Sequence, residues 1–448
     1  MNRTWHIPAI LGVALVVQLA FALVVGDAPL NADEAEYATT ARRLVAGHGL
    51  TLPDGQLNVH RHPPLYPLFL AGIFAAGGGV GAARVVQAIL SVVALAFVYL
   101  TSREALGPKL GARALLLGAL YLPLAYYSTK LLTEVLFAVA LAAALYLTLR
   151  ALGRGRPAYA GAALAGAAFG AAALVRSIAL PAAIGVALYL ALAREGAGRR
   201  RLARAGTFLA GLAIVVGAWS AYVYARTGRL VLTDTNGAAV LYMGNNPRAP
   251  YYHSWEVLRD PRGSAPLLEV SARGADGFEV AASYRREALA YMASHPAATA
   301  TRVAGRLLDL LEPERLFAAT FAAGRLPEVP PGVGWPLAAA VVVVDAFALL
   351  LCGTGLALLP RGRLRDLLLV VAGVFVVLHA LTLAYPRYHV PLVVISLAGA
   401  AYALSARGLP ALGRRRPAWG HLVGLGLVAA AVAASWLRLA VLYLHGRP

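Results

Sequence analysis

Long apolar blocks are the feature that most constrains how this chain can fold. Most of them run for about 17 to 25 residues, the length that a helix needs to cross a hydrocarbon core about 30 Å thick. They lie at residues 7–26, 63–77, 80–101, 114–128, 135–150, 158–175, 177–193, 205–224, 334–359, 366–384, 388–406 and 419–441. Of the 448 residues, 60% are hydrophobic and only 14% are charged, whereas a soluble domain carries about 25% charged residues. The sequence therefore predicts an all-α polytopic membrane protein.

The formal net charge of +19 would indicate a nucleic-acid partner if the protein were soluble. Here the arginines stand in short runs between the apolar blocks, as orientation signals do, and no nucleic-acid or zinc-ligand motif accompanies them. We therefore predict contact with membrane lipid and none with nucleic acid. The single cysteine, Cys352, lies in an apolar stretch, which excludes intrachain disulfides and Cys-rich metal sites. The block 7–26 follows Arg3 and is long for a signal peptide, so we interpret it as an uncleaved anchor.

The block 63–77 decides on which side of the membrane the later loops lie. It is short and opens with Pro63-Pro64. If it lies at the outer interface, the basic clusters between later blocks are cytoplasmic, as the positive-inside rule expects; if it spans, nearly all of them are outside. The interfacial interpretation predicts about eleven spans in the plasma membrane. The outer loops then lie near residues 27–63, 129–134, 175–178, 225–333 and 385–388.

This topology divides the chain into three regions. Residues 1–224 form an N-terminal transmembrane module, whose first outer loop with interfacial helices covers 27–79. Residues 225–333 form a larger outer loop with interfacial helices, and residues 334–448 form C-terminal transmembrane helices. The outer loop at 225–333 is the only sizeable soluble portion that the sequence predicts.

Both large outer loops contain predicted helices. In the first, residues 31–37 start a helix that continues through Val45, with Asn31 or Asp33 as its cap. A solvated helix that begins with acids is the plain explanation for these neighbouring acidic residues. In the larger loop, 278–293 has helical periodicity and 297–311 has the pattern of an amphipathic helix on the membrane surface.

Several short motifs follow one another along the predicted outer face. They are DEAEYATTARRLVAGHGL at 33–50, HRHPPLYPLFLAG at 60–72, ARVVQAILS at 83–91, STKLLTEVLF at 128–137, LVRSIALP at 174–181, TNGAAVLYMGNNP at 235–247 and YPRYHVP at 385–391. In their order and common side they resemble bacterial GT-C glycosyltransferases of the glycosyltransferase family 39-like superfamily. These are the relatives of protein O-mannosyltransferases, of the aminoarabinose lipid A transferase and of the Rgt-type lipopolysaccharide transferases. The resemblance covers nearly the whole chain and implies a GT-C type helix bundle.

The resemblance implies transfer of a sugar from a polyprenyl phosphate to an acceptor at the outer face, with inversion at the sugar. Asp33 matches the family's loop carboxylate and is the expected general base for the acceptor hydroxyl. Its neighbour Glu34 would orient the acceptor or, with Asp33, hold a divalent metal ion through oxygen ligands. Whether a metal is needed stays open. Glu134 matches the family's second acid, although an acid at a helix start is also explained by the helix dipole.

The leaving lipid phosphate calls for arginine, whose guanidinium stays charged and binds phosphate oxygens in pairs. The resemblance places Arg387, Arg176 and Tyr388 at this phosphate, with Arg84 of the second span as a further contact near Gln87. The plain alternative for each arginine is a side chain that reaches the interface from a span end.

Four further residues are candidate substrate contacts: His62 and Tyr66 in HRHPPLYP, and Asn245 and Asn246 in GNNP. His62 stands where some relatives have Lys. The two asparagines are equally well explained by turn formation. Relatives also tend to have Gly and Asn where this chain has Ala238 and Val240, so sugar contacts there depart from the family pattern.

Two ionisable residues, Asp345 and His379, fall inside predicted spans and are functional candidates by position. A buried hydrogen-bond partner is the quiet explanation for each. A transporter or flippase of lipid-linked sugars is the alternative function, and an inactive scaffold of the same fold is a third. The acids and arginines gather at outer loops rather than at a midplane site, which favours the transferase. The sugar stays open, and the acceptor could be a protein hydroxyl, lipopolysaccharide or another envelope glycan.

Overall fold

The computed structural model confirms a helical protein. It describes residues 6–25, 29–53, 55–153, 158–193, 198–247, 276–326, 329–405, 407–409, 426 and 429–438. Within these ranges the regular elements are helices, and the extended pairing consists of one bridge between Thr51 and Leu57.

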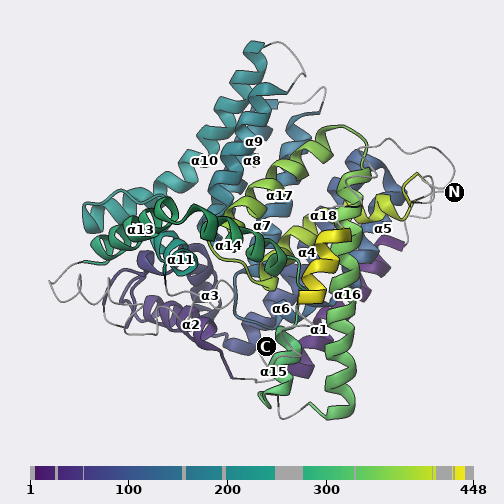
Figure 1. Ribbon diagram of the computed structural model, residues 1–448, viewed down its shortest axis with the longest axis horizontal. Helices are drawn as coiled ribbons and strands as arrows, with labels where there is room; N and C mark the ends of the chain where they lie inside the picture. The colour runs from purple at the N-terminus through teal and green to yellow at the C-terminus, as the bar shows by residue number, and fades with distance from the viewer. Residues whose placement is uncertain are drawn as a thin grey trace.

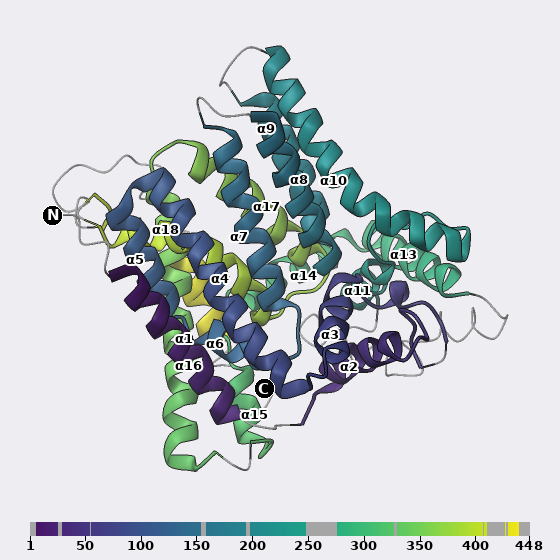
Figure 2. The same ribbon diagram turned by 180° about the vertical axis from the view of Figure 1, so that it is seen from behind.

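Long apolar helices form a bundle that makes up most of the molecule (Figures 1 and 2). They are α1 (His6–Val25), α4 (Val80–Leu106), α5 (Pro108–Ala119), α6 (Leu122–Ser128), α7 (Glu134–Ala151), α8 (Ala158–Val175), α9 (Ala179–Leu192), α10 (Gly198–Thr227), α16 (Pro331–Leu358), α17 (Arg363–Leu381) and α18 (Val390–Ala403). Among the described residues, six helices are long and apolar enough to cross a membrane, or seven if the bent pair α5–α6 counts as one span. A multi-pass membrane protein is therefore confirmed. The count of about eleven spans stays a prediction, and the block 419–441 lies largely outside the described residues.

The block expected at 114–128 is not one straight helix. It is divided between α5 and α6, which meet at an angle of 57°. Pro123 at the start of α6 explains the break, since proline is tolerated in the first turn of a helix but not in its interior.

Glycines allow the closest helix crossings in the bundle. A Cβ atom on Gly211 of α10 would lie 1.9 Å from the carbonyl oxygen of Ala163 in α8. At the crossing of α16 and α18, a Cβ atom on Gly355 would lie 2.1 Å from the carbonyl carbon of Gly399. Small residues at such crossings let backbones approach and gain packing energy where lipid supplies no hydrophobic driving force.

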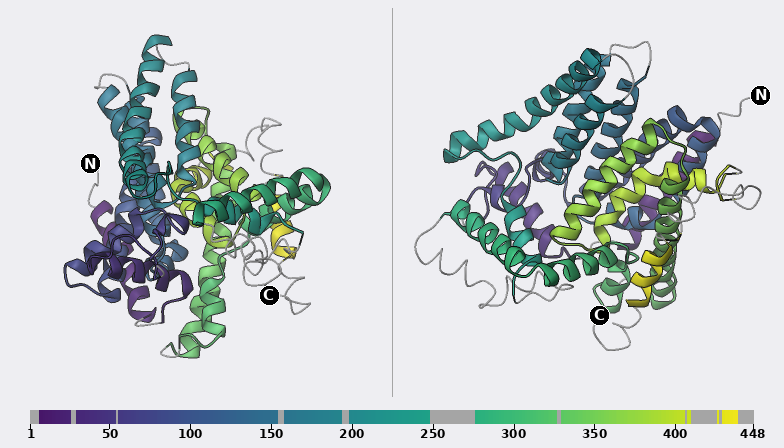
Figure 3. Two further views of the ribbon diagram at one scale, coloured as in Figure 1. Left: turned by 90° about the vertical axis from the view of Figure 1, so that its left-hand side faces the viewer. Right: turned by 45° about the horizontal axis from the view of Figure 1, so that its top comes forward.

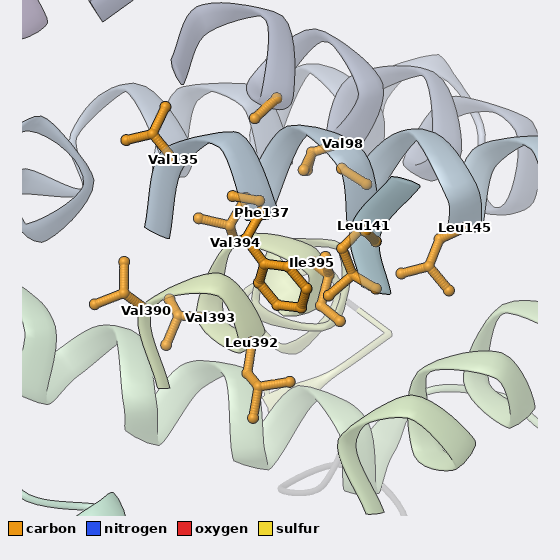
Figure 4. Packing of buried hydrophobic residues seen from close by; sticks show 14 of the residues in the cluster. Val98, Val135, Phe137, Leu141, Leu145, Val390, Leu392, Val393, Val394 and Ile395 are labelled. Carbon is orange, nitrogen blue, oxygen red and sulfur yellow. The ribbon is translucent and has the colours of Figure 1, made fainter. Parts of the chain in front are cut away.

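Helix α18 is the buried centre of the C-terminal half. Every residue from Val390 to Ala401 is buried. Figure 4 shows Phe137 and Leu141 of α7 beside Val394 and Ile395 of α18, so the core joins the N-terminal and C-terminal halves of the chain. This central position fixes the turn that precedes α18, which carries part of the site described below.

Shorter helices from the predicted outer loops cover one side of the bundle. They are α2 (Ala32–Val45), η1 (Asn58–His60), α3 (Leu65–Ala75), α11 (Asn236–Gly244), α13 (Gly277–Ser294), α14 (Pro296–Leu310) and α15 (Leu316–Ala322). Helices α13 and α14 match the two segments predicted in the larger loop, and they run one after the other along the bundle (Figure 3). Asn31, one of the two expected caps, caps the N-terminus of α2. In this capping box the Asn31 side chain accepts from the N–H of Glu34, and the Glu34 side chain accepts from the N–H of Asn31.

The helix α3 is too short to cross a membrane. Its 11 residues rise about 17 Å, little more than half of a hydrocarbon core of about 30 Å. It packs against α2, and residues 77–79 lead directly into α4. Both features agree with the predicted position of 63–77 at the interface.

The helix directions separate the predicted outer loops from the basic clusters. Helix α7 begins at Glu134 and ends beside Arg150, while α17 begins at Arg363 and ends near the turn that precedes α18. The end of the bundle that carries Glu134 is therefore opposite to the end that carries Arg103, Arg150 and Arg363.

Candidate functional site

Four charged residues from distant parts of the chain meet at one end of the bundle. Asp33 lies in the first turn of α2, Glu134 begins α7, Arg176 follows α8, and Arg387 lies in the 3-10 turn η3 (Pro386–His389) before α18. Arg387 Nη2 donates a hydrogen bond of 3.1 Å to Asp33 Oδ2, and Arg176 Nη1 donates one of 3.0 Å to Glu134 Oε1. Arg387 Nε lies 4.0 Å from the same Glu134 oxygen. The predicted residues are thus brought together.

The two acids of this cluster differ in their access to solvent. The Asp33 side chain is 50% exposed, whereas that of Glu134 is 2% exposed. The second Glu134 oxygen, Oε2, is buried and has no hydrogen-bond partner among the described residues. Asp33 is therefore the carboxylate that is open to solvent, and Glu134 is the one that contacts the arginines from within the protein.

Tyr388 supplies an aromatic face to both arginines. Its ring centre lies 4.9 Å from the guanidinium carbon of Arg176 and 5.4 Å from that of Arg387. The ring of His379, to which the sequence assigned no role, lies tilted beside this ring with the ring centres 4.8 Å apart, and its Nδ1 donates a hydrogen bond to the carbonyl of Phe375. Cation–π contacts of this kind hold a guanidinium in place without neutralising its charge.

The segment that leads into Glu134 is fastened by buried polar groups of α3 and α4. Arg84 Nε donates to the carbonyl of Thr129, and Gln87 Nε2 donates to the carbonyls of Ser128 and Lys130. Tyr66, predicted as a substrate contact, is buried and donates its hydroxyl to Gln87. Through these contacts Arg84 and Tyr66 hold the loop that leads into Glu134. The phosphate role of Arg84 and the substrate role of Tyr66 stay predictions.

Glu34 points into the protein rather than toward Asp33. Its Oε2 accepts from the backbone N–H of Asn31, and its Oε1 accepts from the N–H of Leu131. The side chain is fully buried, so it joins α2 to the loop before α7. The described residues hold no cluster of three or more acidic, His or Cys side chains suited to a metal, and a metal held by Asp33 and Glu34 stays a prediction.

His62 takes part in a small polar group beside the site. Its Nδ1 lies 3.1 Å from the Tyr37 hydroxyl, and its Nε2 lies 3.1 Å from Glu36 Oε1. Burial alone would raise the pKa of Glu36, but the hydrogen bond and charge of His62 hold it below its usual value. Glu36 and Tyr37 lie on α2 shortly after Asp33, so this group fixes HRHPPLYP against the helix that carries the expected base.

Asp234 is a residue that the sequence reasoning missed. It accepts hydrogen bonds from the Ser177 hydroxyl, next to Arg176, and from the backbone N–H of Asn236. Burial raises the pKa of Asp234 to about 6. The position of an acid directly before TNGAAV was the available signal, but only the fold shows that it reaches the LVRS turn.

Asn245 and Asn246 serve the turn after α11. Asn245 Nδ2 donates to the carbonyls of Leu241 and Leu381, and Asn246 Nδ2 donates to that of Tyr242. Both side chains are buried. The structure agrees with the turn interpretation, and a sugar contact by either residue stays a prediction.

Asp345, the second ionisable residue inside a predicted span, has a buried hydrogen-bond partner. Its Oδ2 lies 2.8 Å from His389 Nε2, in a buried cluster beside the turn of Arg387. The sequence reasoning had not singled out His389, although it stands two positions after Arg387 in YPRYHVP.

Comparison with known proteins supports the resemblance. The family model described as dolichyl-phosphate-mannose-protein mannosyltransferase matches residues 61–224, which include Glu134 and Arg176. A search of the curated proteins gives no match.

Solved structures of two membrane glycosyltransferases resemble this fold. One is the archaeal oligosaccharyltransferase AglB from Archaeoglobus fulgidus, in complex with an inhibitory peptide and a dolichol-phosphate. It is 13% identical with a TM-score of 0.51, over 97% of this chain and 55% of that chain. The other is ArnT from Cupriavidus metallidurans bound to undecaprenyl phosphate, 17% identical with a TM-score of 0.46, over 92% of this chain and 79% of that chain. The predicted resemblance to GT-C membrane glycosyltransferases is confirmed, and the all-helical fold is of the GT-C type.

Proposed function

We propose that this protein transfers a sugar from a polyprenyl-phosphate donor to an acceptor hydroxyl at the outer face of the plasma membrane. The observation that carries the proposal is the cluster of Asp33, Glu134, Arg176 and Arg387 at one end of the bundle. It combines an accessible carboxylate with two guanidinium groups, which are the groups that a hydroxyl acceptor and a lipid phosphate require. The lipid phosphates in the ArnT and AglB structures support a donor of this class.

The proposed reaction is a single displacement that inverts the configuration of the anomeric carbon. The acceptor oxygen forms the new glycosidic bond while the bond from the anomeric carbon to the donor phosphate oxygen breaks. The electron pair of that bond leaves with the polyprenyl phosphate, and Asp33 accepts the proton of the acceptor hydroxyl. Arg387 and Arg176 stabilise the negative charge that develops on the phosphate.

Donor binding changes the partners of Arg387 in this mechanism. Without donor, Arg387 is paired with Asp33 at 3.1 Å, and protonation of Asp33 would give up that ion pair. A phosphate offers the guanidinium two oxygens and a greater charge. Arg387 therefore turns to the phosphate when the donor binds, and Asp33 is released to act as the base.

Arg176 keeps a different partner throughout. Its contact is with the buried Glu134, which is inaccessible to an acceptor. Glu134 thus holds Arg176 against the Tyr388 ring.

The location of the site at the outer face is proposed from the distribution of basic residues. The basic ends of α4, α7 and α17 lie opposite the site, and basic residues favour the cytoplasmic side. A donor whose tail lies in the bilayer would then meet an acceptor from the envelope.

Reconstitution tests transfer against the alternative function. Purified protein in liposomes is given a radiolabelled polyprenyl-phosphate sugar and extracts of envelope acceptors, and both transfer and movement of the donor between leaflets are measured. We expect labelled acceptor, and movement of donor no faster than in liposomes without protein. Movement of donor without transfer would replace the transferase with a flippase.

A further inference from the structure

A second group of polar side chains is buried beside the proposed site. Asp345 of α16, His389 of η3, Glu314 between α14 and α15, Tyr121 before α6 and Tyr127 within α6 are each at most 2% exposed. None of them contacts the acceptor or phosphate positions argued above. The elements that they join come from both halves of the chain.

Asp345 is the centre of this group and is fully satisfied as a carboxylate. Its Oδ1 accepts from the Tyr121 hydroxyl at 2.6 Å, and its Oδ2 accepts from the backbone N–H of Glu314 at 2.6 Å. The same Oδ2 faces His389 Nε2 at 2.8 Å. Three donors on two oxygens are what an ionised carboxylate accommodates.

His389 is held at both ring nitrogens. Its Nδ1 faces the carbonyl oxygen of Leu310 at 2.8 Å, and a carbonyl can only accept, so this nitrogen carries a proton. Its Nε2 is hydrogen-bonded to Asp345 Oδ2. The ring is therefore fixed between the end of α14 and the middle of α16.

Glu314 connects this ion pair to the other half of the chain. Its Oε2 accepts from the Tyr127 hydroxyl at 2.7 Å, while its Oε1 accepts from the N–H of Leu316 at 2.5 Å. Tyr127 belongs to α6, which leads through the loop at 129–133 to Glu134. The group thus reaches both walls of the site: the loop before Glu134 and the turn that contains Arg387.

The turn η3 is short, so its anchoring decides where its side chains point. Arg387 and Tyr388 face the charged cluster, whereas His389, directly after them, is buried and bound on two sides. A shift of His389 would move Arg387 relative to Asp33, and a displacement of about 1 Å is enough to change rates strongly at a preorganised site.

We propose that His389, held by Asp345 and the carbonyl of Leu310, is the positioning residue that sets Arg387 at the donor phosphate. The role rests on the proposed function, since it specifies how the phosphate-binding arginine of that site is placed. If the pair were merely structural, removing one partner would lower the stability of the fold and leave donor recognition unchanged.

Two measurements on His389→Gln separate these roles. The first is the KM for the polyprenyl-phosphate donor in the transfer assay, together with kcat and the melting temperature. The second needs no activity: the rate at which a short bifunctional thiol reagent links Asp33→Cys to Arg387→Cys in a Cys352→Ala background, with and without His389→Gln. Thr148→Val is the control, because this buried hydroxyl bonds Ala144 near the other end of α7, about 20 Å along the helix from Glu134.

We expect His389→Gln to raise the donor KM at least tenfold and to slow cross-linking severalfold, while Thr148→Val changes neither. Asp345→Asn should move both readouts in the same direction. A lower melting temperature with unchanged KM and unchanged cross-linking would overturn the positioning role. If the unmodified protein transfers no sugar but His389→Gln still slows cross-linking, the positioning role stands and the proposed function falls.

Discussion

Single side chains decide what the charged cluster can do, and Arg387 is the one with two competing partners. It touches the exposed Asp33 and lies near the buried Glu134. Arg176, by contrast, is committed to Glu134. The account therefore assigns donor recognition mainly to Arg387.

Replacing Arg387 by lysine tests this assignment. Lysine keeps the charge but cannot bind two phosphate oxygens in a planar fork. We expect Arg387→Lys to raise the donor KM by roughly 10-fold or more, equivalent to about 1.4 kcal/mol. Initial rates over a range of donor concentrations measure it, with Arg325→Lys as the control at an exposed position. A donor KM equal to that of the unmodified protein would remove Arg387 from the phosphate site.

Asp234 gives the stability of the protein a pH dependence. Its folded-state pKa is raised to about 6, above the value of about 3.9 expected in an unfolded chain. The folded state therefore binds this proton more tightly, so the contribution of Asp234 to stability is present below about pH 4 and is lost as the pH rises through 6. We expect the melting temperature of the unmodified protein to fall across this window relative to that of Asp234→Asn. Parallel curves for the two proteins between pH 4 and 7 would show that Asp234 does not titrate there.

Sequence patterns located the site residues better than they assigned roles. Asp33, Glu134, Arg176 and Arg387 could be predicted because chemistry and motif order agree. The inward orientation of the Glu34 side chain could not be predicted. Neighbouring residues in the first turn of a helix point in different directions, and only the fold shows that the N–H of Leu131 donates to this carboxylate. His389 was missed for the same reason: its acceptors come from residues far away in the chain.

At the scale of elements, contact between backbones sets the stability of the bundle. Helices α8 and α10 touch where Gly211 faces Ala163. A methyl group there must push two backbones apart, and strained cores of this kind cost about 1–3 kcal/mol.

The variant Gly211→Ala should therefore unfold more readily than the unmodified protein. Gly217→Ala is the matched control on the same helix, since its Cβ atom would meet nothing within 4 Å. Removal of a helix-interior glycine at that open position should raise stability by roughly 0.5–1 kcal/mol. Thermal unfolding in detergent, followed by circular dichroism, measures both; equal melting temperatures for the two variants would contradict the close crossing.

Helix positions were predictable to the extent that hydropathy defines them. The short helix α3 and the loop helices α13 and α14 agree with their predicted segments. The division of 114–128 into α5 and α6 was not foreseen, because hydropathy is continuous through Pro123 and only the bend of 57° reveals the break. The hydropathy pattern of a sequence indicates which segments are buried, and a change in helix direction does not alter that pattern.

At the scale of the whole molecule, the account requires the site and the basic clusters to lie on opposite sides of the membrane. Gly79 caps α4 at the end of the bundle that carries Glu134, and Arg361 precedes α17 at the opposite end. Both are exposed, and the native Cys352 is buried.

Cysteine labelling tests this sidedness. In a Cys352→Ala background, we expect Gly79→Cys to react with a membrane-impermeant maleimide in intact spheroplasts. Arg361→Cys should react at least tenfold more slowly until the membrane is permeabilised. The reverse pattern would place the site in the cytoplasm and invert the topology.

The central claim is that Asp33 accepts the proton of the acceptor, and single-turnover transfer by Asp33→Asn tests it most directly. Asparagine keeps the size of the side chain but removes the base and releases Arg387 from its ion pair. At saturating donor we expect transfer to slow by roughly 10²–10⁴-fold, while polyprenyl phosphate binds at least as tightly as to the unmodified protein. Transfer at the unmodified rate would contradict the account.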